Sequence, residues 1–442
     1  MKSARFYILT FVVFCAISFL IACSGRTGQA DRLTNQDIGN FVGEMSDLML
    51  HDVTSPPLAA RFFGYTFLSG YEILSQHDSS YRRLAGKLND YPVLSAPDSI
   101  EGYDYRLAAL LSMIGTASKM QPSGKLLEKY RDQLLASCIE LGYTDGEIEA
   151  SLRYASAVSK KMLQYAKSDG YNKISNFARY TPVEGEGSWY PTPPAFMPAV
   201  EPYFHTIRSF TFDSSSQFKP EPPVPFSKKT NSAFYLQLLL NYNAGKAFPA
   251  DSLLIAAYWD CNPFALQDGG HMQVGLKKIS PGAHWLGITG IACKKANKTF
   301  NESLRIHTYV SLVLMDGFLA CWDEKFRSNR IRPETAIRKY KDPTWKPLLQ
   351  TPPFPEYPSG HSTISAAAAV VLTKYLGDQF EYTDTVEVKF GLPSRKFSSF
   401  NQAADEAGMS RFYGGIHFID AIVNGREQGI KVANHFLKVV EK

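Results

Sequence analysis

Three groups of cationic and hydrogen-bonding residues lie in the C-terminal part of the 442-residue chain. They are Lys325 with Arg332 and Pro333; Pro358-Ser359-Gly360-His361; and Ser410-Arg411 with His417. Guanidinium forks bind oxyanions in pairs, a lysine acts as a point charge, and a helix start supplies backbone N–H donors. The inventory predicts a site for a compact tetrahedral oxyanion with several negative charges, such as phosphate or vanadate. Two imidazoles beside it add groups that can do chemistry.

The first group has helical spacing. Lys325 and Arg332 are seven residues apart, two helical turns, so both point to one side if the segment is helical. Pro333 would then end or bend that helix just past the second cation. Further arginines lie nearby, so the pattern also fits a solvated basic helix face.

The second group follows a proline-rich segment. Residues 349–358 hold four prolines and predict an extended loop, whereas residues 362–376 are rich in alanine and predict a helix. Ser359, Gly360 and His361 would therefore place a hydroxyl, a bare backbone N–H and an imidazole at a positive helix end. The alternative is a serine N-cap with an incidental histidine.

The third group adds Arg411 and a second imidazole, His417, after a diglycine. We expect His417 at the head of a last amphipathic helix, over about residues 415–440. A lone histidine on such a face is usually a satisfied core residue. Its combination with the other two groups makes a functional role the better interpretation.

Together, the patterns K-x6-R-P, P-S-G-H and S-R-x5-H resemble the signature motifs shared by vanadium-dependent haloperoxidases and type 2 phosphatidic acid phosphatases. The resemblance covers roughly residues 35–440 and is strongest over roughly the last 140. It implies an all-α fold of helical bundles of the haloperoxidase/acid phosphatase type. The chain is much longer than small phosphatases of the superfamily, which favours the haloperoxidase branch.

The resemblance also implies roles for single residues. His417 would be the axial ligand of vanadium, or the nucleophile that attacks phosphorus in a phosphatase. His361 would be the general acid/base. The groups that neutralise or hydrogen-bond the oxyanion would be Lys325, Arg332, Ser359, Gly360 and Arg411. Lys325 would in addition polarise the bound oxidant.

Three neighbouring residues are expected beside this site. Trp322 fits the haloperoxidase form of the first motif, and Phe354 stands where chloroperoxidases carry phenylalanine and bromoperoxidases histidine. An aromatic ring there would cover the oxyanion and shape halide access, or else pack only on the core. Phosphatases carry an aspartate four residues after the last histidine, but here that residue is Ala421. Asp420, three residues on, could reach the imidazole across a helical turn; loss of the usual acid favours vanadate over phosphoryl transfer.

Three functions follow as hypotheses. The first is a vanadate-dependent haloperoxidase that oxidises halide with hydrogen peroxide. The second is an acid phosphatase that hydrolyses a phosphomonoester or lipid phosphate through a phosphohistidine at His417, since phosphate fits the same pocket. The third is a non-enzymatic phosphate-binding or scaffold lipoprotein. A net charge of +5 is mild and favours no nucleic-acid partner, and the sequence leaves the oligomeric state open.

The N-terminus has the pattern of an export signal. Residues 1–22 combine a positive start with a long apolar run that ends in Leu20-Ile21-Ala22 before Cys23, which resembles a bacterial lipobox. We expect Cys23 to be lipidated, residues 23–35 to form a tether, and the protein to reside on the periplasmic face of the outer membrane. An ordinary signal peptide or a single membrane anchor is the alternative.

The rest of the chain is expected to form an N-terminal helical region (36–300) and a C-terminal catalytic helical domain (301–442). Four cysteines remain after the signal: Cys138, Cys261, Cys293 and Cys321. Their spacing has no C-x-x-C character, so a structural zinc site is not expected. Disulfides and buried free thiols are both compatible with an exported protein.

Overall fold

The computed structural model describes residues 32–94, 100–245, 248–268, 273–276 and 278–442, so the predicted signal and Cys23 lie outside the described residues. Helices dominate, as the sequence predicted. Those before residue 260 are α2 (Asn35–His51), α3 (Pro56–His77), α4 (Tyr105–Met120), α5 (Leu127–Glu140), α6 (Asp145–Lys167), α7 (Ala233–Ala244) and α8 (Ala250–Tyr258). Those after it are α9 (Pro281–Lys295), α10 (Phe300–Ser328), α11 (Pro333–Tyr340), α12 (Gly360–Leu376), α13 (Phe400–Tyr413) and α14 (Ile419–Glu441).

Strands are short in the described residues. β1 (Leu266–Asp268) pairs with β2 (Gln273–Gly275), and β3 (Tyr382–Asp384) pairs with β4 (Arg395–Phe397), both antiparallel. Single 3-10 turns are η1 (Gly124–Leu126), η2 (Tyr171–Asn176), η3 (Phe204–Thr206) and η4 (Val386–Phe390). Between η2 and α7 the chain has few regular elements, as the proline- and serine-rich composition of residues 185–225 predicts.

Helix α10 forms the centre of the molecule. A capping box closes its N-terminus, with the Thr299 hydroxyl accepting from the Glu302 N–H and the Glu302 carboxylate accepting from the Thr299 N–H. It packs against α3, α9, α12 and α14. Within the described residues it is the one helix long and apolar enough to cross a membrane, but 94% of its most apolar window is buried inside the protein. It is therefore a core helix.

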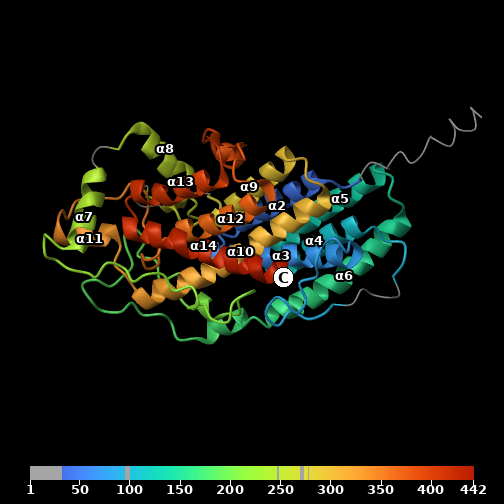
Figure 1. Cartoon of the computed structure of the whole chain (residues 1–442), viewed down its shortest axis with the longest axis horizontal. Coiled ribbons are helices and arrows are strands. Elements are labelled where there is room, and N and C mark those ends of the chain that lie inside the picture. The colour runs from blue at the N-terminus through green and yellow to red at the C-terminus, as the bar shows by residue number, and fades with distance from the viewer. Residues whose placement is uncertain (1–31, 95–99, 246–247, 269–272, 277) are drawn as a thin grey trace, which may run out of the picture.

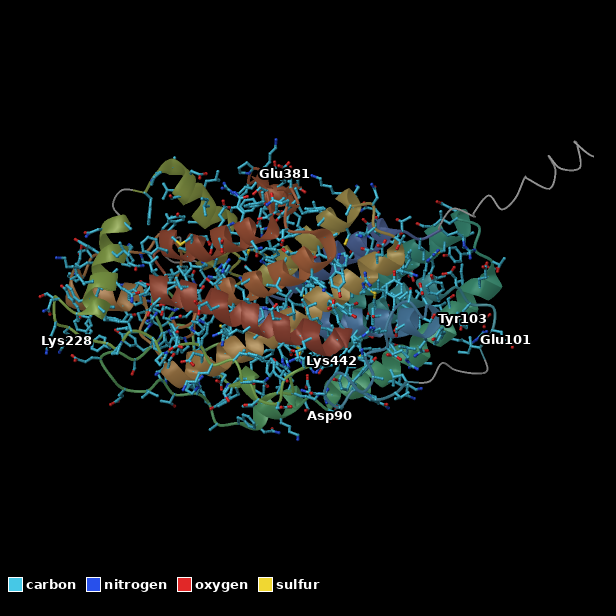
Figure 2. All side chains as sticks on the ribbon, viewed as in Figure 1. Asp90, Glu101, Tyr103, Lys228, Glu381 and Lys442 are labelled. Atoms are coloured by element: carbon cyan, nitrogen blue, oxygen red, sulfur yellow. The ribbon has the colours of Figure 1, made fainter. Side chains whose placement is uncertain are left out.

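The molecule is elongated, with α4, α5 and α6 at one end and α7 and α11 at the other (Figure 1). Helices α12 and α14 pack on α10, and α13 packs on α12 and α14. One apolar core runs from α2 to α14, so α3 and α10 share it across the boundary predicted near residue 300. Charged side chains such as Lys228 and Glu381 project from the outer faces (Figure 2).

Two local expectations are wrong. Helix α10 ends at Ser328 because Asn329 adopts a left-handed conformation (φ 46°), and Pro333 begins α11 instead of ending a helix. Arg332 is the N-cap of α11, so it does not share a helix face with Lys325. Helix α14 begins at Ile419, which leaves His417 in the turn before the helix.

Candidate active site

Five segments bring the predicted oxyanion ligands together. Lys325 lies in the last turn of α10, Arg332 caps α11, Ser359 caps α12, Arg411 lies in the last turn of α13, and His417 precedes α14. All five of these residues are buried, with at most 3% of their surface exposed. Gly360 is the first residue of α12, where a backbone N–H has no acceptor within the helix. The five side chains therefore converge although no two of them share a helix.

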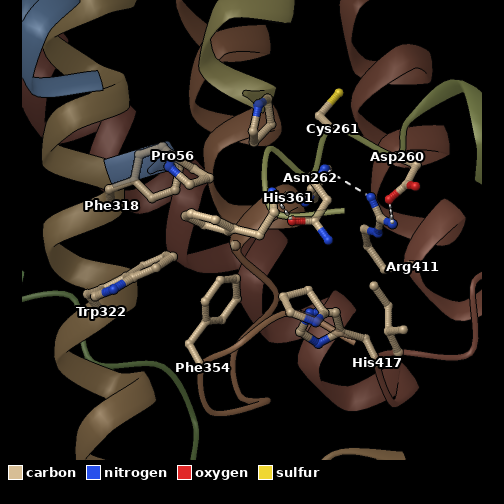
Figure 3. Close-up of a pocket in the computed structure, with 15 residues that line it drawn as sticks. Pro56, Asp260, Cys261, Asn262, Phe318, Trp322, Phe354, His361, Arg411 and His417 are labelled. Carbon is tan, nitrogen blue, oxygen red and sulfur yellow. Dashed lines mark hydrogen bonds and ion pairs between the residues drawn. The ribbon is translucent and has the colours of Figure 1, made fainter. Parts of the chain in front are cut away.

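A cavity opens onto this group. Its lining includes His361, Arg411 and His417 together with Trp322, Phe354 and Phe318, and Figure 3 shows the aromatic rings on one side of it and Arg411 and His417 on the other. Lys325 and Arg332 are fully buried behind this lining. The cavity thus joins a polar, cationic floor to an aromatic wall.

Lys325 has no carboxylate partner among the described residues. Its Nζ donates to the carbonyl oxygens of Pro355 and Glu356, each at 3.1 Å, and of Pro358. Burial lowers the pKa of Lys325 to about 7, and the neighbouring Arg332 charge acts in the same direction. A bound anion would offset both effects.

Arg332 and Arg411 each keep one buried N–H group without a partner in the described residues. Arg332 donates through Nε to Phe354 O and through Nη1 to Ile416 O, both at 2.9 Å, but its Nη2 is unpaired. Arg411 donates through Nη1 to Trp259 O, and its Nε is unpaired. An unsatisfied buried donor costs about 1–3 kcal/mol, and more when charged. These two atoms are the donors that an oxyanion would satisfy.

His417 is held as a neutral imidazole of defined tautomer. Burial, followed by the charges of Arg332 and Lys325, holds the pKa of His417 well below its ordinary value. Its Nδ1 lies 2.9 Å from the Glu356 carboxylate and its Nε2 lies 3.1 Å from Arg332 Nη1. The proton therefore sits on Nδ1, and the Nε2 lone pair faces Arg332, as a metal ligand or nucleophile requires.

Glu356 is the functional residue that sequence reasoning missed. It is fully buried and accepts from His417 Nδ1, from the Phe418 N–H at 2.9 Å, and from Arg330 Nε at 2.6 Å. It is the one acid within residues 349–358, between the prolines that precede the Ser-Gly-His motif. This position beside the motif is the sequence feature that could have identified Glu356 as a site residue.

The expectation that Asp420 reaches the imidazole is wrong. Its two carboxylate oxygens accept from Arg330 Nη1 and Nη2 at 2.5 and 2.7 Å, and one of them also accepts from Val224 N at 3.0 Å. Asp420 therefore acts on His417 only through Arg330 and Glu356. Because Glu356 supplies the orienting acid, the absence of an aspartate at residue 421 no longer favours vanadate over phosphoryl transfer.

His361 occupies the cavity wall opposite the aromatic rings. Its Nε2 lies 3.0 Å from Arg411 Nη1, so this nitrogen is an acceptor. Burial and the Arg411 charge hold the pKa of His361 well below its ordinary value, which leaves the ring neutral and able to take up a proton at Nε2.

Phe354 lies over the cationic floor. Its ring centroid is 5.2 Å from Lys325 Nζ, 5.1 Å from Arg332 Cζ and 5.0 Å from the Trp322 ring. Such contacts stabilise the cations at the ring faces while keeping water away from them. Trp322 is fixed from behind by its indole N–H, which donates to Val200 O at 3.3 Å.

We predict that anion affinity falls as pH rises through the Lys325 titration. Protonated Lys325 binds an anion and neutral Lys325 does not, so a pKa of about 7 gives about tenfold tighter binding at pH 6 than at pH 8. Sulfate is the probe, because its own charge is constant between these pH values, and calorimetry gives the affinity. Lys325→Met should bind sulfate weakly at both pH values, and an unchanged tenfold difference in that variant would assign the titration to another group.

The residues present fit vanadate. Vanadate needs a neutral nitrogen ligand and donors for several anionic oxygens. The site offers the neutral His417 Nε2 and, on Arg332 Nη2 and Arg411 Nε, donors without a partner in the described residues. Lys325 adds a buried ammonium that no carboxylate neutralises in the described residues. Phosphate, which has the same shape and charge, fits the same donors.

Comparisons with known proteins agree with this chemistry. A family model described as the VCPO second helical-bundle domain matches residues 305–442. Vanadium chloroperoxidase of Curvularia inaequalis is 25% identical over 407 residues, which cover 76% of this chain and 64% of that protein. This chain therefore spans less than two thirds of that curated relative.

Solved structures extend the similarity over nearly the whole chain. The crystal structure of a bacterial vanadium-dependent iodoperoxidase is 39% identical, with a TM-score of 0.86, and the match covers 92% of this chain and 96% of that one. A holo-type bacterial vanadium-dependent chloroperoxidase shares the fold at 14% identity and a TM-score of 0.64, covering 88% of this chain and 93% of that one. The 39% identity over nearly the full length, together with the site geometry, shows that this chain belongs to the vanadium haloperoxidase/acid phosphatase superfamily.

Proposed function

We propose that the protein is a vanadate-dependent haloperoxidase that oxidises halide ions with hydrogen peroxide. The observation that carries the proposal is the neutral His417 Nε2, 3.1 Å from Arg332 Nη1, in a buried group of cations where Arg332 Nη2 and Arg411 Nε have no partner in the described residues. The similarity to the iodoperoxidase supports vanadate over phosphate as the bound oxyanion.

Each group of residues in the site would have a separate role. Lys325, Arg332 and Arg411, with the Ser359 hydroxyl and the Gly360 N–H, would hold vanadate against His417 Nε2. Bound vanadate supplies a Lewis-acid centre that activates peroxide without changing its own oxidation state. His361 Nε2 would take up the proton that peroxide gives up on activation and would later return it. The aromatic wall of Trp322 and Phe354 limits the entry of water.

Halide oxidation with and without vanadate tests the proposal. Protein freed of oxyanions and incubated with vanadate should oxidise iodide or bromide in the presence of peroxide, and the same preparation without vanadate should not. Elemental analysis should find vanadium only in the active preparation. Oxidation that is independent of vanadate, or absent after full vanadium loading, contradicts the proposal.

A phosphatase activity is the second candidate, because Glu356 orients His417 as it would a nucleophile. In this reaction His417 Nε2 would attack phosphorus, and His361, after taking up a proton from water, would protonate the leaving alcohol; a second water, deprotonated by His361, would then release phosphate from His417. Hydrolysis of an aryl phosphate that is lost in His417→Ala, from a preparation without halide oxidation, would establish the phosphatase instead.

For the location we propose an exported lipoprotein anchored through Cys23 on the periplasmic face of the outer membrane. The apolar run before Cys23 supports this, and the two acyl chains expected on a lipidated cysteine give stable anchoring where one would not. Cys23→Ala should accumulate as an unprocessed precursor, whereas Ser24→Ala should be processed normally. Membrane fractionation and the mass of the mature N-terminus measure both, and normal processing of Cys23→Ala would contradict the anchor.

A further inference from the structure

A second buried cluster lies next to the oxyanion site and contains none of the predicted oxyanion ligands, although one of its members, Cys261, also lines the cavity. Cys261 follows α8, His284 lies in the first turn of α9, and Glu387 lies in η4. The Cys261 Sγ is 3.5 Å and the Glu387 Oε1 is 3.2 Å from the same atom, His284 Nδ1. All three side chains are buried, and in Figure 3 the Cys261 sulfur points away from the cavity.

The other nitrogen of His284 has a carboxylate partner. His284 Nε2 lies 2.7 Å from Asp384 Oδ2, and the ring stacks on Trp259 with centroids 4.6 Å apart and planes 18° from parallel. Asp384 is itself fixed, since its Oδ1 accepts from the Val386 N–H at 2.9 Å. Although burial opposes it, the Asp384 carboxylate holds the pKa of His284 well above its ordinary value, so without an ion Nδ1 also carries a proton, which points toward Glu387. With an ion bound, the proton on Nε2 would still satisfy Asp384 and the Nδ1 lone pair would face the ion, which is the arrangement of a carboxylate–histidine–metal site.

The separations match a tetrahedral metal. Bonds of about 2.3 Å to sulfur and about 2.0 Å to nitrogen and oxygen place sulfur about 3.5 Å and oxygen about 3.3 Å from the nitrogen. The observed distances are 3.5 and 3.2 Å. The three ligand atoms all lie within 4.8 Å of one another, so one ion can contact all of them.

We propose that Cys261, His284 and Glu387 bind one zinc ion, with Asp384 as the hydrogen-bond partner of the histidine. Thiolate, imidazole and carboxylate together are a ligand set typical of zinc. Calcium and magnesium prefer oxygen ligands, so a site with sulfur and nitrogen ligands does not suit them. The ion takes the place of two protons, one on the thiol and one on Nδ1, so the net charge of the buried cluster does not change. This assignment differs from the sequence expectation of no zinc site, because that expectation used cysteine spacing alone.

The site would anchor the segment that holds Arg411. Trp259 O accepts from Arg411 Nη1, and Asp260 lies 3.6 Å from Arg411 Nη2, both directly before Cys261. A bound ion would fix this segment to α9 and η4. Zinc would therefore stabilise the fold and is independent of vanadate.

Metal content tests the proposal on the full-length protein. Wild type and the control Cys293→Ser, which replaces another buried free thiol, should each retain about one zinc per chain after dialysis against zinc and removal of the excess. Cys261→Ser and Glu387→Gln should retain at least tenfold less. Wild-type protein without zinc, or Cys261→Ser with as much zinc as Cys293→Ser, overturns the proposal.

Cobalt gives a second readout that needs no stable variant. Co²⁺ bound by wild type should produce a thiolate charge-transfer band and the intense visible absorption of a tetrahedral ion, and added zinc should displace both. The charge-transfer band should persist in Cys293→Ser. Its absence from cobalt-treated wild type overturns the proposal even if Cys261→Ser fails to fold.

Discussion

His417→Ala is expected to lower vanadate affinity by more than about 100-fold, since loss of a partner that merely orients a ligand already costs about 10–100-fold. Halide oxidation should fall with it. His417 supplies the neutral Nε2 that faces the arginine donors, and alanine leaves a space there that water fills without the same geometry. Calorimetric titration with vanadate gives the affinity, and the rate of halide oxidation at saturating peroxide gives the activity.

His435→Ala is the matched control. His435 lies on α14, away from the cavity, and its Nε2 donates to Thr211 O at 2.9 Å. Its loss should leave vanadate binding close to that of wild type. If His417→Ala bound vanadate as tightly as His435→Ala does, the nitrogen ligand would have to be another residue.

The sequence predicted the members of the site because their chemistry depends on short motifs. Lys325 and Arg332, the Ser-Gly-His start of α12, and Arg411 with His417 could each be found from residue types and spacing. The serine at a helix start is a local property, and Ser359 does cap α12, accepting from the Ser362 N–H at 3.3 Å.

Pairings made by tertiary contact could not be predicted in this way. Glu356 and His417 are 61 residues apart, and they meet because the loop before α12 folds against the turn before α14. Asp420 was the nearer acid in sequence, but the buried Arg330 takes its carboxylate. The second cluster could not be predicted either, because Cys261 and Glu387 lie far apart in the sequence and meet only through tertiary contact.

The prediction of one continuous helix from Lys325 to Arg332 was wrong for a local reason, which their seven-residue spacing does not reveal. A seven-residue separation places two side chains on one face only if the helix continues, and Asn329 interrupts it in a conformation that asparagine tolerates better than most residues. Pro333 was interpreted as a stop, whereas proline also favours the first turn of a new helix. Arg332 reaches the site from that start.

The pair Glu356→Gln and Asp420→Asn decides which acid positions His417. Glu356→Gln should lower vanadate affinity about 10–100-fold, because a glutamine amide has no charge to hold the Nδ1–H tautomer. It should also reduce the free energy of unfolding by about 3–5 kcal/mol, the cost of breaking a buried ion pair, since Arg330 Nε loses its carboxylate. Urea unfolding and vanadate titration measure the two effects.

Asp420→Asn is expected to have smaller effects on both quantities. The Asp420 side chain is 14% exposed, Arg330 keeps its contact with Glu356, and no atom of Asp420 bonds to His417 in the described structure. The pH profile of halide oxidation separates positioning from stability. Glu356→Gln should move its acid limb to lower pH, because without this carboxylate the pKa of His417 falls still further below its ordinary value, and Asp420→Asn should not. A larger loss of vanadate affinity in Asp420→Asn than in Glu356→Gln would show that Asp420, and not the Glu356 carboxylate that contacts Nδ1, orients His417.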